Sequence, residues 1–332
     1  MQVDHEDSEP MSSDPLTLPI AFPLAVTTWN IQSLFAEKDD RASQKRRMVT
    51  KLLRNCDVLC LQETRADDAH AVAFGDLFRG SVVSFWSSLG RDAGGVCILI
   101  KLDFLKKYLP GAVFTRIELI QGRILGLKVV SHVGRLHIWN VHLHHQCKHT
   151  RVDQIRSLAG ALRTNRDAMA AVWVGGDFNF VASSADRIHH GVDGFSIQPP
   201  DDEAADFRRI LAEPHHLLEI EQNEHTRHGA GTTAKLDRLY SNHHPGEQLI
   251  YEFFSYVRLD TRGLSDHFPV SAGKRIPAGA GSHGRIPDWI CRTREFMVAV
   301  RAEFKIRSIL SQERTPWAKV GRWKKACQKI WK

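Results

Sequence analysis

The sequence predicts an α/β protein in which apolar strands alternate with amphipathic helices, and three observations lead to that class. The run 171–174 is apolar, too short for a helix and stopped by two glycines, which is typical of a strand in a covered sheet. Strands are also predicted at 25–29 and 57–62, on either side of a helix at 43–55. Both of these strands end at polar side chains, as strands do where α/β enzymes build their sites.

The other elements follow in chain order. Residues 1–19 are polar, acidic and without a period, so we expect them to be disordered. Ser43 is a suitable cap for the helix at 43–55, which would turn Leu52 and Leu53 inward and Lys45 outward. The remaining predicted elements are strands at 81–86 and 95–101, a hairpin of 124–131 and 136–142, a helix at 151–165, a loop-rich stretch up to Pro200, a helix at 203–212, a strand at 235–240 and a terminal strand that begins near 265.

The charge of the chain is unevenly distributed. The net charge of the 332 residues is +7, but residues 276–332 contain 13 Lys and Arg against 4 Asp and Glu, a net +9, which leaves 7 − 9 = −2 for residues 1–275. We therefore expect one domain at 20–275, followed by a basic linker and helical tail at 276–332. Such a tail is either a solvated segment or a contact for nucleic acid or a partner.

The cysteines and the chain start bear on the compartment. The six cysteines form no Cys-x-x-Cys pair, and three lie in apolar runs, which is typical of reduced thiols in an intracellular protein. The first residues are acidic where a secretion signal would be basic, and no apolar run reaches the length of a membrane span. We expect an intracellular protein of the nucleus or cytoplasm that is neither secreted nor bound to a membrane.

Polar residues recur where predicted strands end. Taken singly, each has an ordinary explanation: a turn for Asn30, a solvated carboxylate for Glu63, an Asx turn for 177–179 and an exposed salt bridge for Asp237. The full set in chain order is Asn30, Glu63, His142, Asp177 with Asn179, Asp237, and Asp266 with His267.

A histidine cluster follows the predicted strand at 136–142. It comprises His142, His144, His145 and His149, a spacing that suggests zinc, although no cysteine or carboxylate completes a known ligand pattern. The alternative is that His142 alone is functional.

The order and context of these residues resemble the endonuclease/exonuclease/phosphatase superfamily over residues 24–275. The most specific motifs are Gln-Glu-Thr at 62–64, Gly-Asp-Phe-Asn at 176–179 and Ser-Asp-His at 265–267. The resemblance implies a four-layer α/β sandwich, with two packed sheets flanked by helices. Segments 232–240 and 285–289 are most similar to the apurinic-type endonuclease domains of non-LTR retrotransposons and to the segment that joins them to a reverse transcriptase.

The resemblance also implies a metal site. Glu63, helped by Asn30 and Asp266, would hold Mg²⁺, with Mn²⁺ as a substitute ion. Carboxylate and amide oxygens are the ligands that this hard cation prefers.

The catalytic roles are likewise carried over from the superfamily. Asp177 would orient or deprotonate the attacking water, and Asn179 would donate to the scissile phosphate. His267, kept charged by Asp237, would bind or protonate the phosphate. His142 stands where apurinic-type enzymes have a tyrosine, and this position is closer to other phosphodiesterases of the superfamily.

The leading hypothesis is thus a Mg²⁺-dependent endonuclease that nicks DNA and leaves a 3′ hydroxyl. A second hypothesis is a phosphodiesterase that acts on RNA, lipid headgroups or small phosphoesters, which the same metal site could serve. A third is an inactive binding module derived from a retroelement. DNA is the expected partner in the first hypothesis, and the oligomeric state is left open.

Overall fold

The computed structural model describes residues 23–35, 40–91, 93–191, 194–222, 224–243, 253–261 and 263–274. The predictions of a disordered start at 1–19 and of a basic helical tail at 276–332 lie outside these residues.

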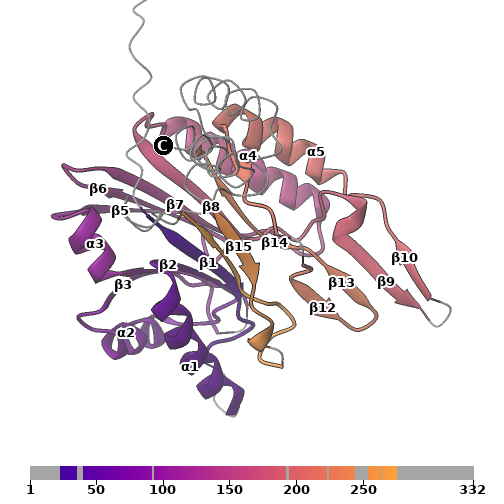
Figure 1. Cartoon of the computed structure of the whole chain (residues 1–332), viewed down its shortest axis with the longest axis horizontal. Helices are drawn as coiled ribbons and strands as arrows, with labels where there is room; N and C mark the ends of the chain where they lie inside the picture. The colour runs from indigo at the N-terminus through magenta and orange to yellow at the C-terminus, as the bar shows by residue number, and fades with distance from the viewer. Residues whose placement is uncertain are drawn as a thin grey trace, which may run out of the picture.

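Two six-stranded mixed sheets face each other in the described part of the chain (Figure 1). The strands of the first sheet, from edge to edge, are β15 (Phe254–Val257), β16 (Val270–Gly273), β1 (Ala25–Asn30), β2 (Val58–Gln62), β4 (Val96–Lys101) and β3 (Val82–Ser87). The strands of the second sheet are β11 (Leu218–Glu219), β14 (Asp237–Ser241), β8 (Ala170–Asp177), β7 (Arg135–His142), β6 (Ile124–Val130) and β5 (Val113–Ile120).

The register brings the polar strand ends together. β1 pairs in parallel with β2, so that Asn30 lies opposite Gln62, the residue before Glu63. β7 pairs in parallel with β8, so that His142 lies opposite Asp177. The carboxyl ends of parallel strands lie at one end of a sheet. Asn30 and Gln62 therefore lie together at that end of the first sheet, and His142 and Asp177 lie together at that end of the second.

Apolar side chains fill three spaces and thereby define four layers. The central core lies between the sheets and includes Ile98 and Trp173. A second core lies between the first sheet and the helices α1 (Asp40–Asn55) and α2 (Asp68–Leu77). A third lies between the second sheet and the helices α4 (Lys148–Thr164) and α5 (Glu203–Phe207). The four-layer α/β sandwich is confirmed.

A smaller four-stranded sheet extends from one end of the sandwich (Figure 1). Its strands in order are β10 (Gly194–Ile197), β9 (Arg187–Gly191), β13 (Thr232–Ala234) and β12 (Arg227–Gly229). The prediction of a loop-rich stretch up to Pro200 was therefore wrong. These strands are short and rich in Gly, His and Arg, so they lack the apolar alternation that marks a strand in a sequence.

Other differences concern helices. α1 begins at Asp40 and not at Ser43. Lys45 was expected to face outward but is buried, since its Nζ donates to the carbonyls of Gln32 and Ser33. The helices α2 and α3 (Leu102–Tyr108) and the strand β5 were not predicted.

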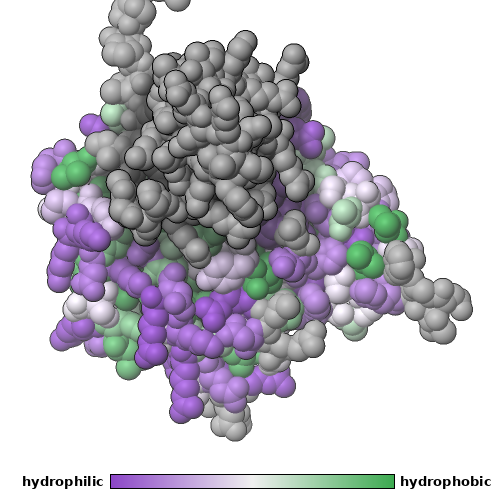
Figure 2. All heavy atoms as spheres, viewed as in Figure 1, coloured by the Kyte–Doolittle hydropathy of each residue, from purple (hydrophilic) through white to green (hydrophobic). Residues whose placement is uncertain are grey.

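The surface around α1 is hydrophilic in Figure 2, in agreement with its exposed basic residues. Within the described ranges, every helix is too short or too polar to cross a membrane.

Candidate active site

Asp177 is the last residue of β8 and follows two glycines. The neighbouring strands leave no room for a side chain at either glycine. A Cβ on Gly176, whose φ is +152°, would lie 1.8 Å from the carbonyl oxygen of Val141, and one on Gly175 would lie 2.5 Å from the Leu239 side chain. In the structure the two glycines admit close approach of β7 and β14.

The Asp177 carboxylate is buried and held on both oxygens. Its Oδ2 accepts a hydrogen bond from Asn30 Nδ2 at 2.9 Å, and its Oδ1 accepts one from the backbone N–H of Asn179 at 3.0 Å. Asn179 has a φ of +53° and closes the Asx turn that was the ordinary interpretation of this motif. Burial raises the pKa of Asp177, against the attraction of the nearby His267.

His267 is buried between carboxylates. Its Nδ1 lies 2.8 Å from Asp237 Oδ2, and its Nε2 lies 3.8 Å from Asp177 Oδ2 and 3.7 Å from Asp266 Oδ1. Burial disfavours the charged ring, but the carboxylates of Asp237 and Asp177 outweigh this effect and raise the pKa of His267 to about 9. The ring is therefore an imidazolium near neutral pH.

Asn30, Glu63 and Asp266 are the residues that were predicted to hold a metal ion. Asn30 Nδ2 donates to Glu63 Oε1 at 3.0 Å and so orients that carboxylate toward Asp177. Asp266 is brought close because the neighbouring Ser265 hydroxyl donates to the Asn30 carbonyl at 2.8 Å.

The carboxylate of Asp266 is only half used. Its Oδ2 accepts from Arg227 Nε at 3.0 Å, whereas its Oδ1 is buried and has no hydrogen-bond partner among the described residues. A buried carboxylate oxygen without a donor is a suitable ligand for a hard cation. The residues present therefore fit a divalent metal ion.

A second group of possible ligands lies around His267, beside Asp266. Among the described residues, the only set of three acidic, histidine or cysteine side chains with converging ligand atoms is Asp177, Asp237 and His267. The protonated His267 has no lone pair to offer a metal, because Nδ1–H donates to Asp237 and Nε2 also carries a proton. This trio is better suited to proton and phosphate contacts.

His142 faces the same site together with an arginine that was not predicted. His142 Nε2 lies 3.6 Å from Glu63 Oε1, and Arg123 Nη1 lies 3.1 Å from His142 Nδ1. Burial lowers the pKa of His142 to about 3, so the ring is neutral. Arg123 comes from the turn between β5 and β6, and it was missed because β5 was not predicted.

The neighbouring histidines do not build a zinc site in the described part of the chain. His144 Nδ1 accepts from the amides of Gln146 and Cys147. His144 and His145 stack with ring centroids 5.4 Å apart. Neither belongs to the converging set described above.

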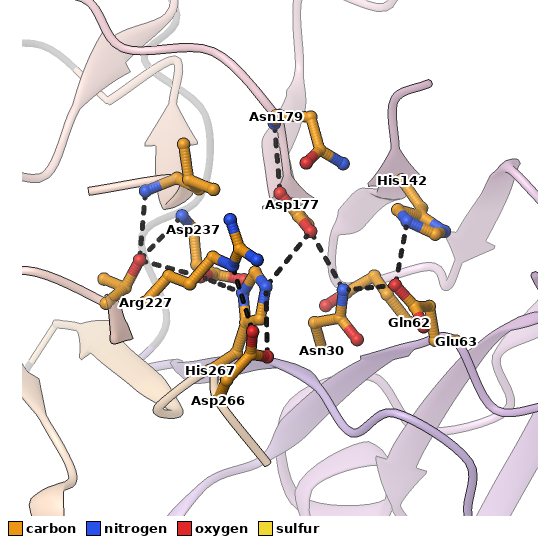
Figure 3. A network of polar contacts seen from close by, with 12 residues as sticks. Asn30, Gln62, Glu63, His142, Asp177, Asn179, Arg227, Asp237, Asp266 and His267 are labelled. Carbon is orange, nitrogen blue, oxygen red and sulfur yellow. Dashed lines mark hydrogen bonds and ion pairs between the residues drawn. The ribbon is translucent and has the colours of Figure 1, made fainter. Parts of the chain in front are cut away.

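Figure 3 shows the predicted residues around one small space between the ends of the two sheets. Dashed contacts link them from His142 on one side to Asp237 on the other. The predicted residues brought together are Asn30, Glu63, His142, Asp177, Asn179, Asp237, Asp266 and His267.

Solved structures match about three quarters of the chain, while none of the curated proteins searched matches it. The endonuclease domain of TRAS1, a telomere-specific non-LTR retrotransposon, gives a TM-score of 0.53 at 14% identity and covers 76% of this chain and 99% of that domain. The AP endonuclease LMAP from Leishmania major gives 0.57 at 19%, covering 77% and 88%. TDP2 from D. rerio, complexed with a single-strand DNA product, gives 0.52 at 18%, covering 76% and 98%.

At these identities the structural matches establish the fold. They confirm the sandwich that the motifs at 62–64, 176–179 and 265–267 had implied. The model of the Endonuclease/Exonuclease/phosphatase family matches residues 27–267, well over half of the sequence, and the chain therefore belongs to that family.

Proposed function

We propose that this protein is a Mg²⁺-dependent endonuclease that hydrolyses one phosphodiester bond of DNA and leaves a 3′ hydroxyl. The observation that carries the proposal is the buried ion pair of His267 and Asp237, set beside Asp177 and beside the half-used carboxylate of Asp266. Phosphodiester hydrolysis needs positive charge beside the phosphate and a carboxylate nearby that can accept a proton from the attacking water.

The metal would be held by Glu63 and Asp266, with Asn30 orienting Glu63 through its amide. When bound there, Mg²⁺ neutralises charge that develops on the phosphate and on the leaving oxygen. Mn²⁺ has the same preference for oxygen ligands and is the expected substitute.

The remaining residues handle the water and the phosphate. Asp177 accepts the proton of the attacking water, since its carboxylate is held in place by Asn30 and by the Asn179 amide. His267 presents its Nε2–H to a phosphate oxygen while Asp237 holds Nδ1. Asn179 donates one amide hydrogen to the Leu143 carbonyl at 2.9 Å, and its other hydrogen serves the phosphate.

DNA is the proposed substrate because the structural matches named above are endonucleases or hold a DNA product. The retrotransposon endonuclease among them supports a cut that leaves a primer end, in agreement with the resemblance of segment 232–240.

The test is conversion of supercoiled plasmid to open circles in Mg²⁺ or in EDTA. The parent should nick only with Mg²⁺, and Asp177→Asn and Glu63→Gln should each lower the rate by about 100-fold or more. Asp76→Asn is the matched control, because Asp76, in the last turn of α2, makes an exposed ion pair with Arg79. Extension of the nicked product by a DNA polymerase, without phosphatase treatment, tests for the 3′ hydroxyl.

A second candidate is a phosphodiesterase acting on RNA or small phosphoesters. It is favoured by the neutral His142 and the adjacent Arg123, which together offer a histidine and a guanidinium where apurinic-type enzymes use tyrosine. Turnover of such a substrate faster than plasmid nicking, with the same loss in Asp177→Asn, would replace the first proposal by this one.

A further inference from the structure

A side-chain amide lies in the middle of the sandwich, where apolar residues would be expected. Asn140 on β7 is fully buried between the two sheets. Its Nδ2 crosses to the first sheet and donates to the carbonyls of Leu61 at 2.9 Å and Cys97 at 2.8 Å. Its Oδ1 accepts from Gln62 Nε2 at 2.7 Å. Gln62 Nε2 also donates to Thr28 Oγ1 at 2.9 Å.

These hydrogen bonds fix the orientation of both amides. Both N–H groups of Asn140 and both N–H groups of Gln62 have acceptors, so neither side chain can turn without losing bonds in a dry core. A buried amide lowers stability unless it is bonded in this way, and an apolar side chain would meet no such demand. The network therefore needs a reason beyond packing.

The network lies one layer of side chains below the active site. Thr28 precedes Asn30 by two residues on β1, and Asn140 precedes His142 by two on β7. Gln62 immediately precedes Glu63, at the end of β2. One network thus cross-links the three strands that carry these site residues.

Glu63 is the residue that most needs such support. Its φ is +50°, a left-handed conformation that is strained for a non-glycine residue and persists only where the surroundings impose it. Gln62 is the last residue of the ladder before this turn, and it pairs with Asn30 in register. The side chain of Gln62 is held by Asn140 from the opposite sheet.

We propose that Asn140 is a positioning residue, which acts through Gln62 to hold Glu63 and thereby sets the affinity of the site for its divalent cation. This inference rests on the proposed function, because it takes Glu63 as a metal ligand. It assigns to a residue in the core an effect on metal binding, which a purely structural residue would not have.

The test is Mn²⁺ binding to the full chain without substrate, followed by the electron paramagnetic resonance signal of free Mn²⁺. Asn140→Leu removes the amide at similar volume and should weaken Mn²⁺ binding roughly tenfold. Thr28→Val removes only the last acceptor and should weaken it about threefold. The control is Thr27→Val, which breaks the buried Thr27–Ser271 hydrogen bond of 2.7 Å on the same strand and should leave the affinity unchanged.

The outcomes separate the two proposals. If Asn140→Leu folds and binds Mn²⁺ as tightly as the parent does, the positioning role is overturned. The same holds if Thr27→Val loses as much Mn²⁺ affinity as Asn140→Leu does. If Asn140→Leu does not fold, unchanged affinity in Thr28→Val overturns it and a loss supports it. If the unsubstituted protein binds no Mn²⁺, that result overturns the proposed metal-dependent function together with this inference.

Discussion

Hydrogen bonds from two backbone N–H groups fix the direction in which the Thr226 hydroxyl donates its proton. Its Oγ1 accepts from the amides of Leu236 and Asp237, both at 3.0 Å, so its own proton goes to Asp237 Oδ2 at 2.7 Å. Asp237 Oδ2 also accepts a hydrogen bond from Nδ1 of His267. The Asp237 carboxylate is thereby held in one orientation for the histidine.

Replacing this hydroxyl should affect both stability and catalysis. Thr226→Val should lower the free energy of unfolding by about 1–3 kcal/mol, because two buried amides lose their acceptor. It should also slow plasmid nicking, whereas Thr226→Ser should keep most of both. Urea denaturation and nicking rates measure the two effects, and equal behaviour of the Val and Ser variants would show that the hydroxyl is not needed.

The raised pKa of His267 predicts a pH-dependent stability. The folded pKa of about 9 exceeds the unfolded value of 6.5, so the stabilisation is complete below about pH 6.5 and is lost as the pH rises through 9. In EDTA, the difference in unfolding free energy between parent and His267→Gln should shrink over this window, by at most about 1.4 kcal/mol per pH unit. A difference that does not change with pH would mean that the folded ring is not protonated.

The residues of the site that could be predicted are those in short local motifs. Asp177 and Asn179 are two residues apart, and Asp266 and His267 are adjacent; each pair stands where an apolar strand ends or begins. Arg123 could not be predicted in the same way, because only the pairing of β5 with β6 turns it toward His142. Local patterns reveal strand ends, while the partners of a residue across sheets depend on the fold.

At the scale of elements, burial on two sides made strands predictable. β2 and β8 are covered by other layers, and their sequences therefore begin with apolar runs, 58–61 and 170–174. β9 and β10 lie in the projecting sheet and are held by pairing with few apolar contacts, so no periodic signal marks them. Lys45 was misplaced because its role, binding two loop carbonyls, is tertiary.

An ion network joins this projecting sheet to the sandwich. Arg238 on β14 is buried, and its guanidinium donates to Glu219 at 2.9 Å and to Asp186 at 2.7 Å. Glu219 belongs to β11, and Asp186 directly precedes β9. Arg238 therefore links β14 to both segments, although Lys235 also pairs with Glu219 at 2.8 Å.

Removing that side chain should be strongly destabilising. Arg238→Met removes the ion pair of Asp186, whereas Glu219 keeps Lys235 Nζ at 2.8 Å, and the unfolding free energy should fall by about 3 kcal/mol. Hydrogen exchange should rise first in β9. Arg79→Met is the control, since Arg79 makes an exposed pair with Asp76 and should change stability little. Similar small effects in both variants would show that the network contributes specificity of pairing only.

At the scale of the whole molecule, the charge of the chain and the position of the site are separate. Residues 1–275 contain the family match and carry a net −2, whereas residues 276–332 carry +9. A polyanionic substrate gains little from the net charge of the domain itself. In the proposed reaction, Arg123 and His267 would contact the phosphate locally, whereas affinity for a long nucleic acid would need positive charge elsewhere in the chain.

Truncation after Arg275 tests whether the basic segment provides that affinity. Binding to duplex DNA should weaken and should depend less on salt, because each phosphate that a Lys or Arg neutralises contributes about −0.9 to the slope of log K against log salt concentration. The rate of nicking at saturating plasmid should stay within about twofold of the full chain, since the residues of the site lie before position 275. Fluorescence anisotropy at several salt concentrations, with nicking rates at saturation, measures both quantities. Equal salt slopes in the two proteins would place the DNA-binding charge within the sandwich, and a fall in the saturated rate would show that the segment also supports the site.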